Sequence, residues 1–322
     1  MSVVGSWLPV TGYRPPTTDH CNTVYDFDAF LDETREHVNR ALTAVLDDYL
    51  TGVDEWLTEP IRYACEGGGK RFRAILFLAS YEVSGRAPDH RVSRLATALE
   101  IVHAYSLVHD DLPCMDDDDW RRGRPTCHRA FGAERATIAA AAMVPLASWV
   151  VAEEARAMGL PAAESAVLVA ELSEAAGPQG MVGGQVLDLI SEGQAVTGDE
   201  LVEIHRRKTG ALIRAAARLG GRVGRLTPPI LQAVTDYGER VGLAFQIADD
   251  VLDEEGTTAS LGKDAHSDRE LGKATYPGVF GMERARAEAR RLADEAIAAL
   301  RRAAIASPAL EGLAIHVVER ES

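Results

Sequence analysis

Residues 91–108 read RVSRLATALEIVHAYSLV, in which leucine, isoleucine, valine and alanine recur every three or four positions. This spacing is that of one face of an α-helix. The same period recurs in residues 30–50 and 285–300, whereas the apolar–polar alternation typical of strands is nearly absent. The sequence therefore predicts an all-α fold of about ten to thirteen helices, each of roughly 15–25 residues.

The helical segments are separated only by short glycine, proline or polar clusters. These clusters are Gly67–Gly69, Gly85–Pro88, Gly159–Pro161, Gly193–Gly198, Thr227–Pro229 and Gly278. Because no long proline- or serine-rich linker divides the chain, we expect residues 25–322 to form a single large helical bundle. Residues 1–24 contain several prolines and no apolar period, so we expect them to form an extended tail.

Composition excludes several classes of protein. The 322 residues carry a net charge of −15, with 49 acidic against 34 basic residues, which argues against binding to nucleic acid. Four cysteines without a CxxC pattern favour free thiols in a reducing, cytoplasmic environment, and the absence of an apolar N-terminal region argues against a secretory signal.

The longest uncharged run, residues 136–152, is 17 residues long and contains Pro145. We expect it to form a buried helix, because a membrane span needs about 20 apolar residues.

Two aspartate motifs carry the chemistry. Residues 110–119 read DDLPCMDDDD, and the first motif comprises Asp110, Asp111 and Asp116. The second comprises Asp249, Asp250 and Asp253, and it begins 139 positions later inside another apolar segment. Asp249 and Asp253 are four positions apart and share one helix face. Asp110 and Asp116 would diverge on a regular helix, but Pro113 breaks the helix and allows them to converge.

An isolated acidic run is usually a solvated loop. These carboxylates instead follow apolar helical stretches, where an unpaired charge is costly to desolvate, so they require a counter-charge. Oxygen ligands without neighbouring histidine or cysteine ligands suit Mg²⁺, which usually binds through a few carboxylates together with substrate phosphates. The sequence therefore predicts a magnesium-dependent site for a phosphorylated substrate.

Basic residues support a phosphate ligand. Residues 67–73 read GGGKRFR, and residues 121–124, directly after the first aspartate motif, read RRGR. Arginine matches phosphate oxygens in a bidentate manner. The glycine-rich turn lacks the spacing of a nucleotide-binding P-loop, which disfavours an ordinary kinase or ATPase.

His103 and Ser106 share the helix face of Asp110, although a lone helical histidine is more often part of the core. Further cations that are weak evidence singly are Lys208, Lys263 and Lys273.

Together these segments resemble the trans-isoprenyl diphosphate synthases, the polyprenyl synthetase family, and the likeness extends from about Gly67 to Arg320. The motifs that carry it, in the order of the family, are GGGKRFR, DDxxxxD followed by RRGRP, GGQxxD at Gly183–Asp188, Lys208-Thr209, FQIADDVLD at Phe245–Asp253, and Lys263 with KATYP at Lys273–Pro277. The family fold is a helical bundle around a central active-site cavity. Its reaction ionises an allylic diphosphate, and isopentenyl diphosphate then attacks the resulting carbocation.

The resemblance implies a role for each matching residue. Three Mg²⁺ ions would be held by Asp110, Asp111, Asp116, Asp249, Asp250 and Asp253. The allylic diphosphate would be bound by Arg121, Lys208, Lys263 and Lys273, with Thr209 and Gln246 nearby. Isopentenyl diphosphate would be bound by Lys70, Arg73, His103 and Arg122. The catalytic set would be Lys208, Thr209, Gln246, Arg121, Arg122 and Lys263. The family also implies a homodimer.

Product length depends in this family on the residues four and five positions before the first aspartate, here Ser106 and Tyr105. A bulky Tyr105 would close the tunnel for the growing chain. With the insertion Pro113-Cys114, this pattern resembles the bacterial farnesyl type, so we expect a C15 product, with a C20 product as the alternative. The sequence departs from the family at Ala140–Met143, where Gly-Asp-Ala-Leu is usual, and at Ala74 and Trp120.

Three other functions are less well supported. A class I terpene cyclase shares the bundle and the first motif, but its second metal motif contains Asn, Ser and Glu in place of this second aspartate motif. A metal phosphohydrolase would need more histidines near the aspartates than His103 and His109. A non-catalytic regulatory subunit would be expected to have lost metal ligands, whereas all six aspartates are present here.

Overall fold

The computed structural model describes residues 25–255 and 273–320. The tail expected at residues 1–24, and Lys263, lie outside the described residues. Within the described ranges the fold is all-α, as the periodicity predicts, apart from one two-stranded hairpin. Fourteen α-helices are present there, two of them only five residues long, so the twelve longer ones agree with the predicted number.

The elements follow one another along the chain with short connections. They are α1 (Phe27–Tyr49), α2 (Glu55–Glu66), α3 (Phe72–Glu82), α4 (His90–Asp110), β1 (Trp120–Arg121), β2 (Arg124–Pro125), α5 (Cys127–Phe131), α6 (Ala133–Ala157), α7 (Ala162–Ala176), α8 (Met181–Ser191), α9 (Gly198–His205), the π-helical segment η1 (Arg206–Gly210), α10 (Ala211–Val223), α11 (Pro228–Glu255), α14 (Tyr276–Phe280), α15 (Met282–Arg302) and α16 (Pro308–Glu319).

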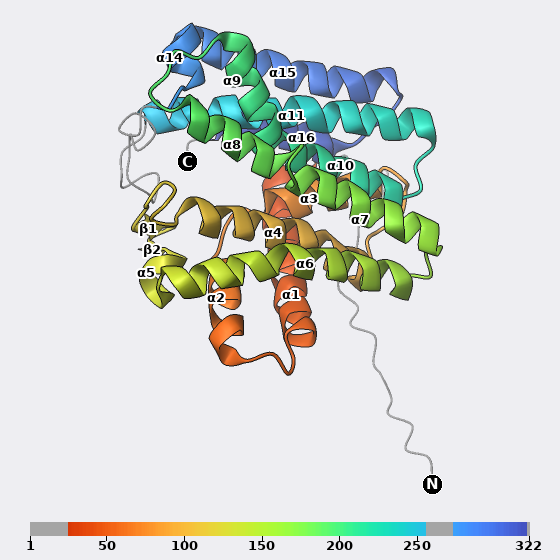
Figure 1. Cartoon of the computed structure of the whole chain (residues 1–322). Helices are drawn as coiled ribbons and strands as arrows, with labels where there is room; N and C mark the ends of the chain where they lie inside the picture. Colours follow the sequence, from red (N-terminus) through yellow and green to blue (C-terminus); the bar gives the residue numbers. More distant parts are fainter. Residues whose placement is uncertain (1–24, 256–272, 321–322) are drawn as a thin grey trace.

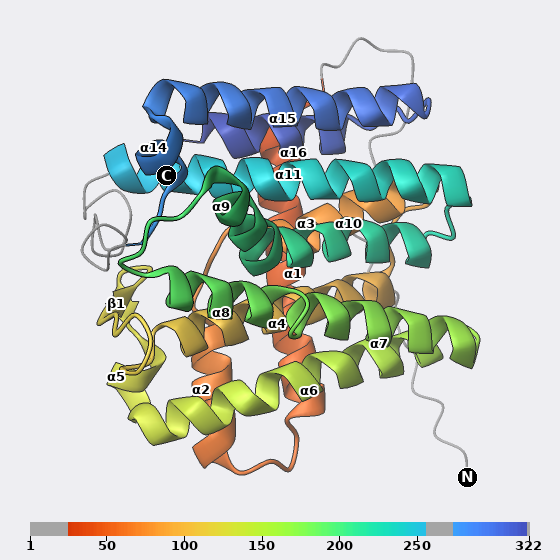
Figure 2. The same cartoon turned by 45° about the horizontal axis from the view of Figure 1, so that its top comes forward.

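Helices α4 and α11 place the two aspartate motifs. Asp89 caps the start of α4 by accepting hydrogen bonds from the amides of Arg91 and Val92, which satisfies otherwise unpaired donors. The middle of α4 is buried on almost all sides, since it packs against α1, α3 and α6, while α11 packs against α10 and α15. Both helices end at the same side of the bundle, next to the β1–β2 hairpin and α14 (Figures 1 and 2). Both motifs therefore lie at that end of the bundle.

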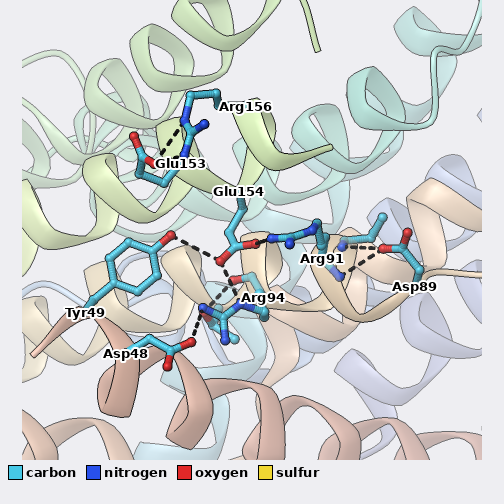
Figure 3. A network of polar contacts seen from close by, with 10 residues as sticks. Asp48, Tyr49, Asp89, Arg91, Arg94, Glu153, Glu154 and Arg156 are labelled. Carbon is cyan, nitrogen blue, oxygen red and sulfur yellow. Dashed lines mark hydrogen bonds and ion pairs between the residues drawn. The ribbon is translucent and has the colours of Figure 1, made fainter. Parts of the chain in front are cut away.

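A buried ion network fastens the opposite, N-terminal part of α4 to its neighbours (Figure 3). The Glu154 carboxylate of α6 is 2% exposed and accepts hydrogen bonds from the Tyr49 hydroxyl (3.1 Å) and the guanidinium groups of Arg91 (3.2 Å) and Arg94 (2.7 Å). Arg94 also pairs with Asp48 at 2.9 Å. Because Tyr49 belongs to α1 and the arginines to α4, this single carboxylate joins three helices.

Helix α6 contains the long uncharged run. By length and composition alone it could cross a membrane, but one face packs against α2, α4, α5 and α7. The prediction of a buried helix is correct for that face. The opposite face carries an exposed stripe, named here the α6 stripe, formed by Ile138, Ala141, Pro145 and Trp149. The cysteines in the described part of the chain are free thiols.

Candidate active site

The first aspartate motif lies where α4 ends. Asp110 is its last residue, and the chain then turns through Pro113 so that the Asp116 amide donates to the Asp110 carbonyl oxygen at 2.9 Å. This hydrogen bond closes a seven-residue loop and brings the two residues together. Asp117 follows with φ +53°, a left-handed conformation that aspartate tolerates better than most residues.

The β1–β2 hairpin places Arg121 against this loop. The Arg121 guanidinium donates to the carboxylates of Asp111 at 2.6 Å and Asp118 at 2.9 Å. Asp111 is buried. Burial raises the pKa of its carboxyl group to about 6, although the Arg121 charge opposes this shift. In the described structure, Arg121 therefore holds the loop in place and offsets the negative charge of the buried Asp111 carboxylate.

Two lysines from distant parts of the chain contact the same region. The Lys273 ammonium donates to Asp116 at 2.7 Å, and Lys208 donates to Asp188 of α8 at 2.5 Å. Burial lowers the pKa of Lys208, but the carboxylates of Asp188, Asp110 and Asp116 outweigh burial and raise it overall. Lys208 is therefore a permanent cation close to the first aspartate motif.

In the second aspartate motif, Asp250 is held by protein groups. Its carboxylate accepts hydrogen bonds from the Gln246 side chain (2.9 Å) and the Tyr276 amide (2.7 Å), and the His205 ring lies 3.3 Å away. The Thr209 hydroxyl donates in turn to the Gln246 carbonyl oxygen at 2.5 Å. Thr209 and Gln246, both predicted site residues, thus form a chain that orients Asp250.

The six aspartates divide into two groups by exposure. Asp111, Asp250 and Asp253 are buried, whereas Asp110, Asp116 and Asp249 are only partly buried. Burial, and then the neighbouring Asp116 carboxylate, raise the pKa of Asp110, an effect that an added cation would oppose. In the described part of the chain no three ligand side chains converge on one point as a protein-only metal cage would require. This arrangement fits Mg²⁺, which takes few carboxylates and completes its shell with water and phosphate oxygens.

Four predicted residues form a basic cluster beside these carboxylates: Lys70, Arg73, His103 and Arg122. Burial and neighbouring arginines lower the pKa of Arg73 and Arg122, and they lower the pKa of His103 well below its usual value. The buried Nε of Arg73 has no hydrogen-bond acceptor within the described ranges. Mutually repelling cations with an unpaired donor are suited to bind an anion.

The glycine-rich turn brings the basic cluster together. Gly69 has φ +122°, and a Cβ atom there would lie 2.8 Å from the Arg122 guanidinium carbon. Arg122 donates to the Gly68 carbonyl oxygen at 2.6 Å. A side chain at position 69 would displace Arg122, so glycine at this position is explained by the close approach of the hairpin arginine.

Tyr105 and Ser106 lie on the turn of α4 that precedes Asp110. The Tyr105 ring is half-buried, packs against a buried apolar cluster that includes Val108 and Leu112, and lies 5.7 Å from the His109 ring. The Ser106 hydroxyl donates to the His103 carbonyl oxygen at 2.8 Å.

Two of the positions at which the sequence departs from the family lie on α6. Ala140 is buried in the apolar cluster against which Tyr105 packs, whereas Ala141, at the position of the usual aspartate, is exposed.

The structure adds residues that our sequence prediction did not assign. Asp188 binds Lys208, and the Gln185 amide is buried without a partner in the described part of the chain. Their three-residue spacing in GGQVLD places both on one helix face, a signal that could have revealed them. Arg320 pairs with Asp249 at 2.5 Å, and no local pattern in the sequence marks it.

Together, the helical bundle and the neighbouring acidic and basic clusters fit the class of enzymes that act on diphosphate substrates. A sequence profile described as polyprenyl synthetase matches residues 54–307. The chain belongs to the polyprenyl synthetase family, and it is a trans-prenyltransferase.

Relatives of two product types support this assignment. The chain is 42% identical over 302 residues to a farnesyl diphosphate synthase of Escherichia coli, covering 92% of this chain and 99% of that protein. It is 40% identical over 281 residues to a chloroplastic geranylgeranyl pyrophosphate synthase of Arabidopsis thaliana, covering 85% and 76%.

Solved structures agree with the fold. An FPP/GFPP synthase from Zymomonas mobilis has a TM-score of 0.78 and 34% identity, covering 90% of this chain and 99% of that one. A geranyltransferase of Helicobacter pylori, complexed with magnesium and isoprenyl diphosphate, has a TM-score of 0.77 and 26% identity, covering 92% and 98%.

Proposed function

We propose that this enzyme condenses isopentenyl diphosphate with dimethylallyl and then geranyl diphosphate, and that it releases farnesyl diphosphate and pyrophosphate. The observation that carries the proposal is the placement of two aspartate motifs, from α4 and α11, beside a basic cluster at one end of the bundle. The identity to farnesyl diphosphate synthases over nearly the whole chain supports the C15 product.

We assign the metal ligands by exposure. Asp110, Asp116 and Asp249 would contact three Mg²⁺ ions directly, together with water and the allylic diphosphate. The metal would supply positive charge that stabilises the departing pyrophosphate. The buried Asp111, Asp250 and Asp253 would support these ligands, since Arg121 compensates Asp111 while Gln246, His205 and Tyr276 orient Asp250. The magnesium in the related geranyltransferase structure supports the choice of metal.

The cations would divide between the two substrates. Lys208, Lys273 and Arg121, which contact or adjoin the first aspartate motif, would bind the allylic diphosphate, and Lys263 would join them. Lys70, Arg73, His103 and Arg122 would hold the diphosphate of isopentenyl diphosphate. Burial strengthens the charge–charge contacts of Arg73 in particular, because less water screens this buried guanidinium. The two diphosphates would thereby be oriented for attack without a side-chain nucleophile.

Product identification tests this function. Purified protein is incubated with Mg²⁺, isopentenyl diphosphate and, in parallel, dimethylallyl, geranyl or farnesyl diphosphate, and the dephosphorylated alcohols are identified by mass. Farnesol from the first two primers and no elongation of the third is the expected result. Geranylgeraniol would support the C20 alternative, which the geranylgeranyl synthase relatives favour. Absence of product from every primer would support a regulatory subunit.

Replacing Tyr105 with alanine is expected to lengthen the main product from C15 to C20 or beyond. The half-buried ring lies in the apolar cluster beside α4, and its removal would extend the space for the isoprenoid tail. Mass analysis of the products measures the change. Tyr105→Phe, which keeps the ring, is the control and should still give C15. An unchanged C15 product from Tyr105→Ala would exclude Tyr105 as the floor.

We also propose that the enzyme is a cytoplasmic homodimer that pairs through the α6 stripe. Ile138 and Trp149 are 45% and 51% exposed, and they lie on one face of a long apolar helix. Ile138→Glu is expected to convert the dimer into monomers, as measured by light scattering coupled to size exclusion. Ile315→Glu, at an exposed position on α16, should leave the mass unchanged. An intact dimer of Ile138→Glu would place the interface elsewhere.

A further inference from the structure

The loop of the β1–β2 hairpin holds a basic residue in a strained conformation. Arg122 and Gly123 form this two-residue loop, with φ values of +54° and +70°. Positive φ at both positions is typical of such loops and suits asparagine and glycine, whereas an arginine there is uncommon. A conformation of this kind persists where the surroundings hold it in place. The contacts that fix the hairpin therefore determine where the Arg122 guanidinium lies.

Tyr63 of α2 contacts the second strand of the hairpin in two ways. Its hydroxyl donates to the Pro125 carbonyl oxygen at 2.7 Å. The Arg124 guanidinium lies over its ring, with 3.9 Å between the guanidinium carbon and the ring centroid. The Phe131 ring of α5 meets the same ring edge to face, with the centroids 5.2 Å apart. Because these contacts are directional, one tyrosine fixes the hairpin and α5 against α2.

The hairpin arginines also lie against the glycine-rich turn that follows α2. A Cβ atom added at Gly67 would lie 3.1 Å from Nη1 of Arg124. Arg122 donates to the Gly68 carbonyl oxygen at 2.6 Å. Tyr63, four residues before Gly67, thus fastens the hairpin beside the turn that leads into the basic cluster.

The other hairpin arginine has fixed partners of its own. The Arg121 guanidinium donates to the carboxylates of Asp111 at 2.6 Å and Asp118 at 2.9 Å. Hydrogen bonds between two charged groups are stronger than a bond to a neutral carbonyl oxygen such as that of Arg122. Loss of the Tyr63 contacts should therefore displace Arg122 more than Arg121.

We propose that Tyr63 is a positioning residue for isopentenyl diphosphate. Together with Arg124 it holds the hairpin at the distance from the glycine-rich turn at which Arg122 completes the diphosphate site. The inference rests on the proposed binding of isopentenyl diphosphate by Arg122. Without Tyr63, Arg122 would have to be ordered when the substrate binds, and that loss of conformational freedom weakens binding.

Two substitutions of Tyr63 grade the effect. Tyr63→Phe removes the hydroxyl and keeps the ring, and we expect its Kd for isopentenyl diphosphate to rise about 3- to 10-fold, the usual effect of one lost hydrogen bond. Tyr63→Leu also removes the ring beneath Arg124 and should raise Kd about 10- to 30-fold. Isothermal titration calorimetry without an allylic substrate measures Kd. In both variants KM for geranyl diphosphate and kcat should stay within about twofold, because Arg121 keeps its carboxylate partners.

Tyr49→Phe is the matched control. The Tyr49 hydroxyl also donates a hydrogen bond, to Glu154 at 3.1 Å, and Arg94 lies over its ring at 5.8 Å. These contacts belong to the network at the opposite end of the bundle (Figure 3). The control should therefore lower stability without changing Kd for isopentenyl diphosphate.

A double variant separates positioning from a general loss of stability. If Tyr63 acts through Arg122, the two effects do not multiply, so Tyr63→Phe combined with Arg122→Gln should bind isopentenyl diphosphate about as weakly as Arg122→Gln alone. An unchanged Kd in Tyr63→Phe, or multiplied effects in the double variant, would overturn the proposal. An original enzyme that binds isopentenyl diphosphate but makes no prenyl product would refute the proposed function instead, and the calorimetric comparison would still decide the role of Tyr63.

Discussion

Asparagine in place of Asp110 or Asp249 is expected to lower kcat by about 10²- to 10³-fold or more, because each change removes a carboxylate that would hold a metal ion against the leaving pyrophosphate. Both side chains reach the surface of the site and come from different helices, α4 and α11. Asparagine keeps the size of the side chain, so the fold should persist. Initial rates with geranyl and isopentenyl diphosphate measure the loss, and far-ultraviolet circular dichroism verifies the helical content.

The matched control is Asp117→Asn. Asp117 is in the same acidic run, but its side chain is 64% exposed and lies 3.7 Å from the His128 ring. Its φ of +53° is tolerated by asparagine as well as by aspartate. This variant should retain nearly the original kcat. Near-normal turnover by Asp110→Asn or Asp249→Asn would contradict the assignment of these residues as metal ligands.

The fold class could be predicted from sequence because it depends on local spacing. The three- and four-residue period of residues 91–108 is enough to specify a helix that buries most of its surface, and α4 does so. The exit of the chain from α4 could be predicted for the same reason, since Pro113 disfavours continuation of the helix. Local steric rules thus give both the helices and the turn of the first aspartate motif.

The outward face of α6 could not be predicted in this way. A run of 17 uncharged residues contains no charged side chain, and only the two polar ones of Thr137 and Ser148, to mark which face meets solvent. The expectation of a buried helix therefore missed the exposed positions of Ile138 and Trp149. Tertiary packing against the neighbouring helices, which sequence period alone does not describe, decides which face is covered.

Partners within the site were only partly predictable. The resemblance to a family named the aspartates and most cations, but not their pairing. Lys273 contacts Asp116 across 157 positions, and Arg320 contacts Asp249 across 71 positions. These pairs form because the connections and helix ends that carry them lie at one side of the bundle, which is a property of topology. The same limit applies to Asp111 and Asp110, adjacent in sequence but different in exposure.

Glu154→Ala is expected to reduce the free energy of unfolding by about 3–5 kcal/mol, the usual effect of removing one partner from a buried charge network. The change leaves Arg94, whose side chain is 14% exposed, and the Tyr49 hydroxyl without their shared acceptor between α1, α4 and α6 (Figure 3). Urea denaturation followed by circular dichroism measures the difference.

The effect should be confined to stability. Arg94 precedes Asp110 by sixteen residues of one helix, about 24 Å along its axis, so kcat at a temperature where the variant is folded should be close to that of the original enzyme.

Glu153→Ala provides the matched control, because the neighbouring Glu153 pairs with Arg156 on the surface, and its loss should cost at most about 0.5–1 kcal/mol. A similar loss of stability in both variants would show that the helix surface, rather than the buried carboxylate, is responsible. A loss below about 1 kcal/mol for Glu154→Ala would mean that water or neighbouring groups, among them the Asp48 carboxylate that also pairs with Arg94, replace the lost carboxylate.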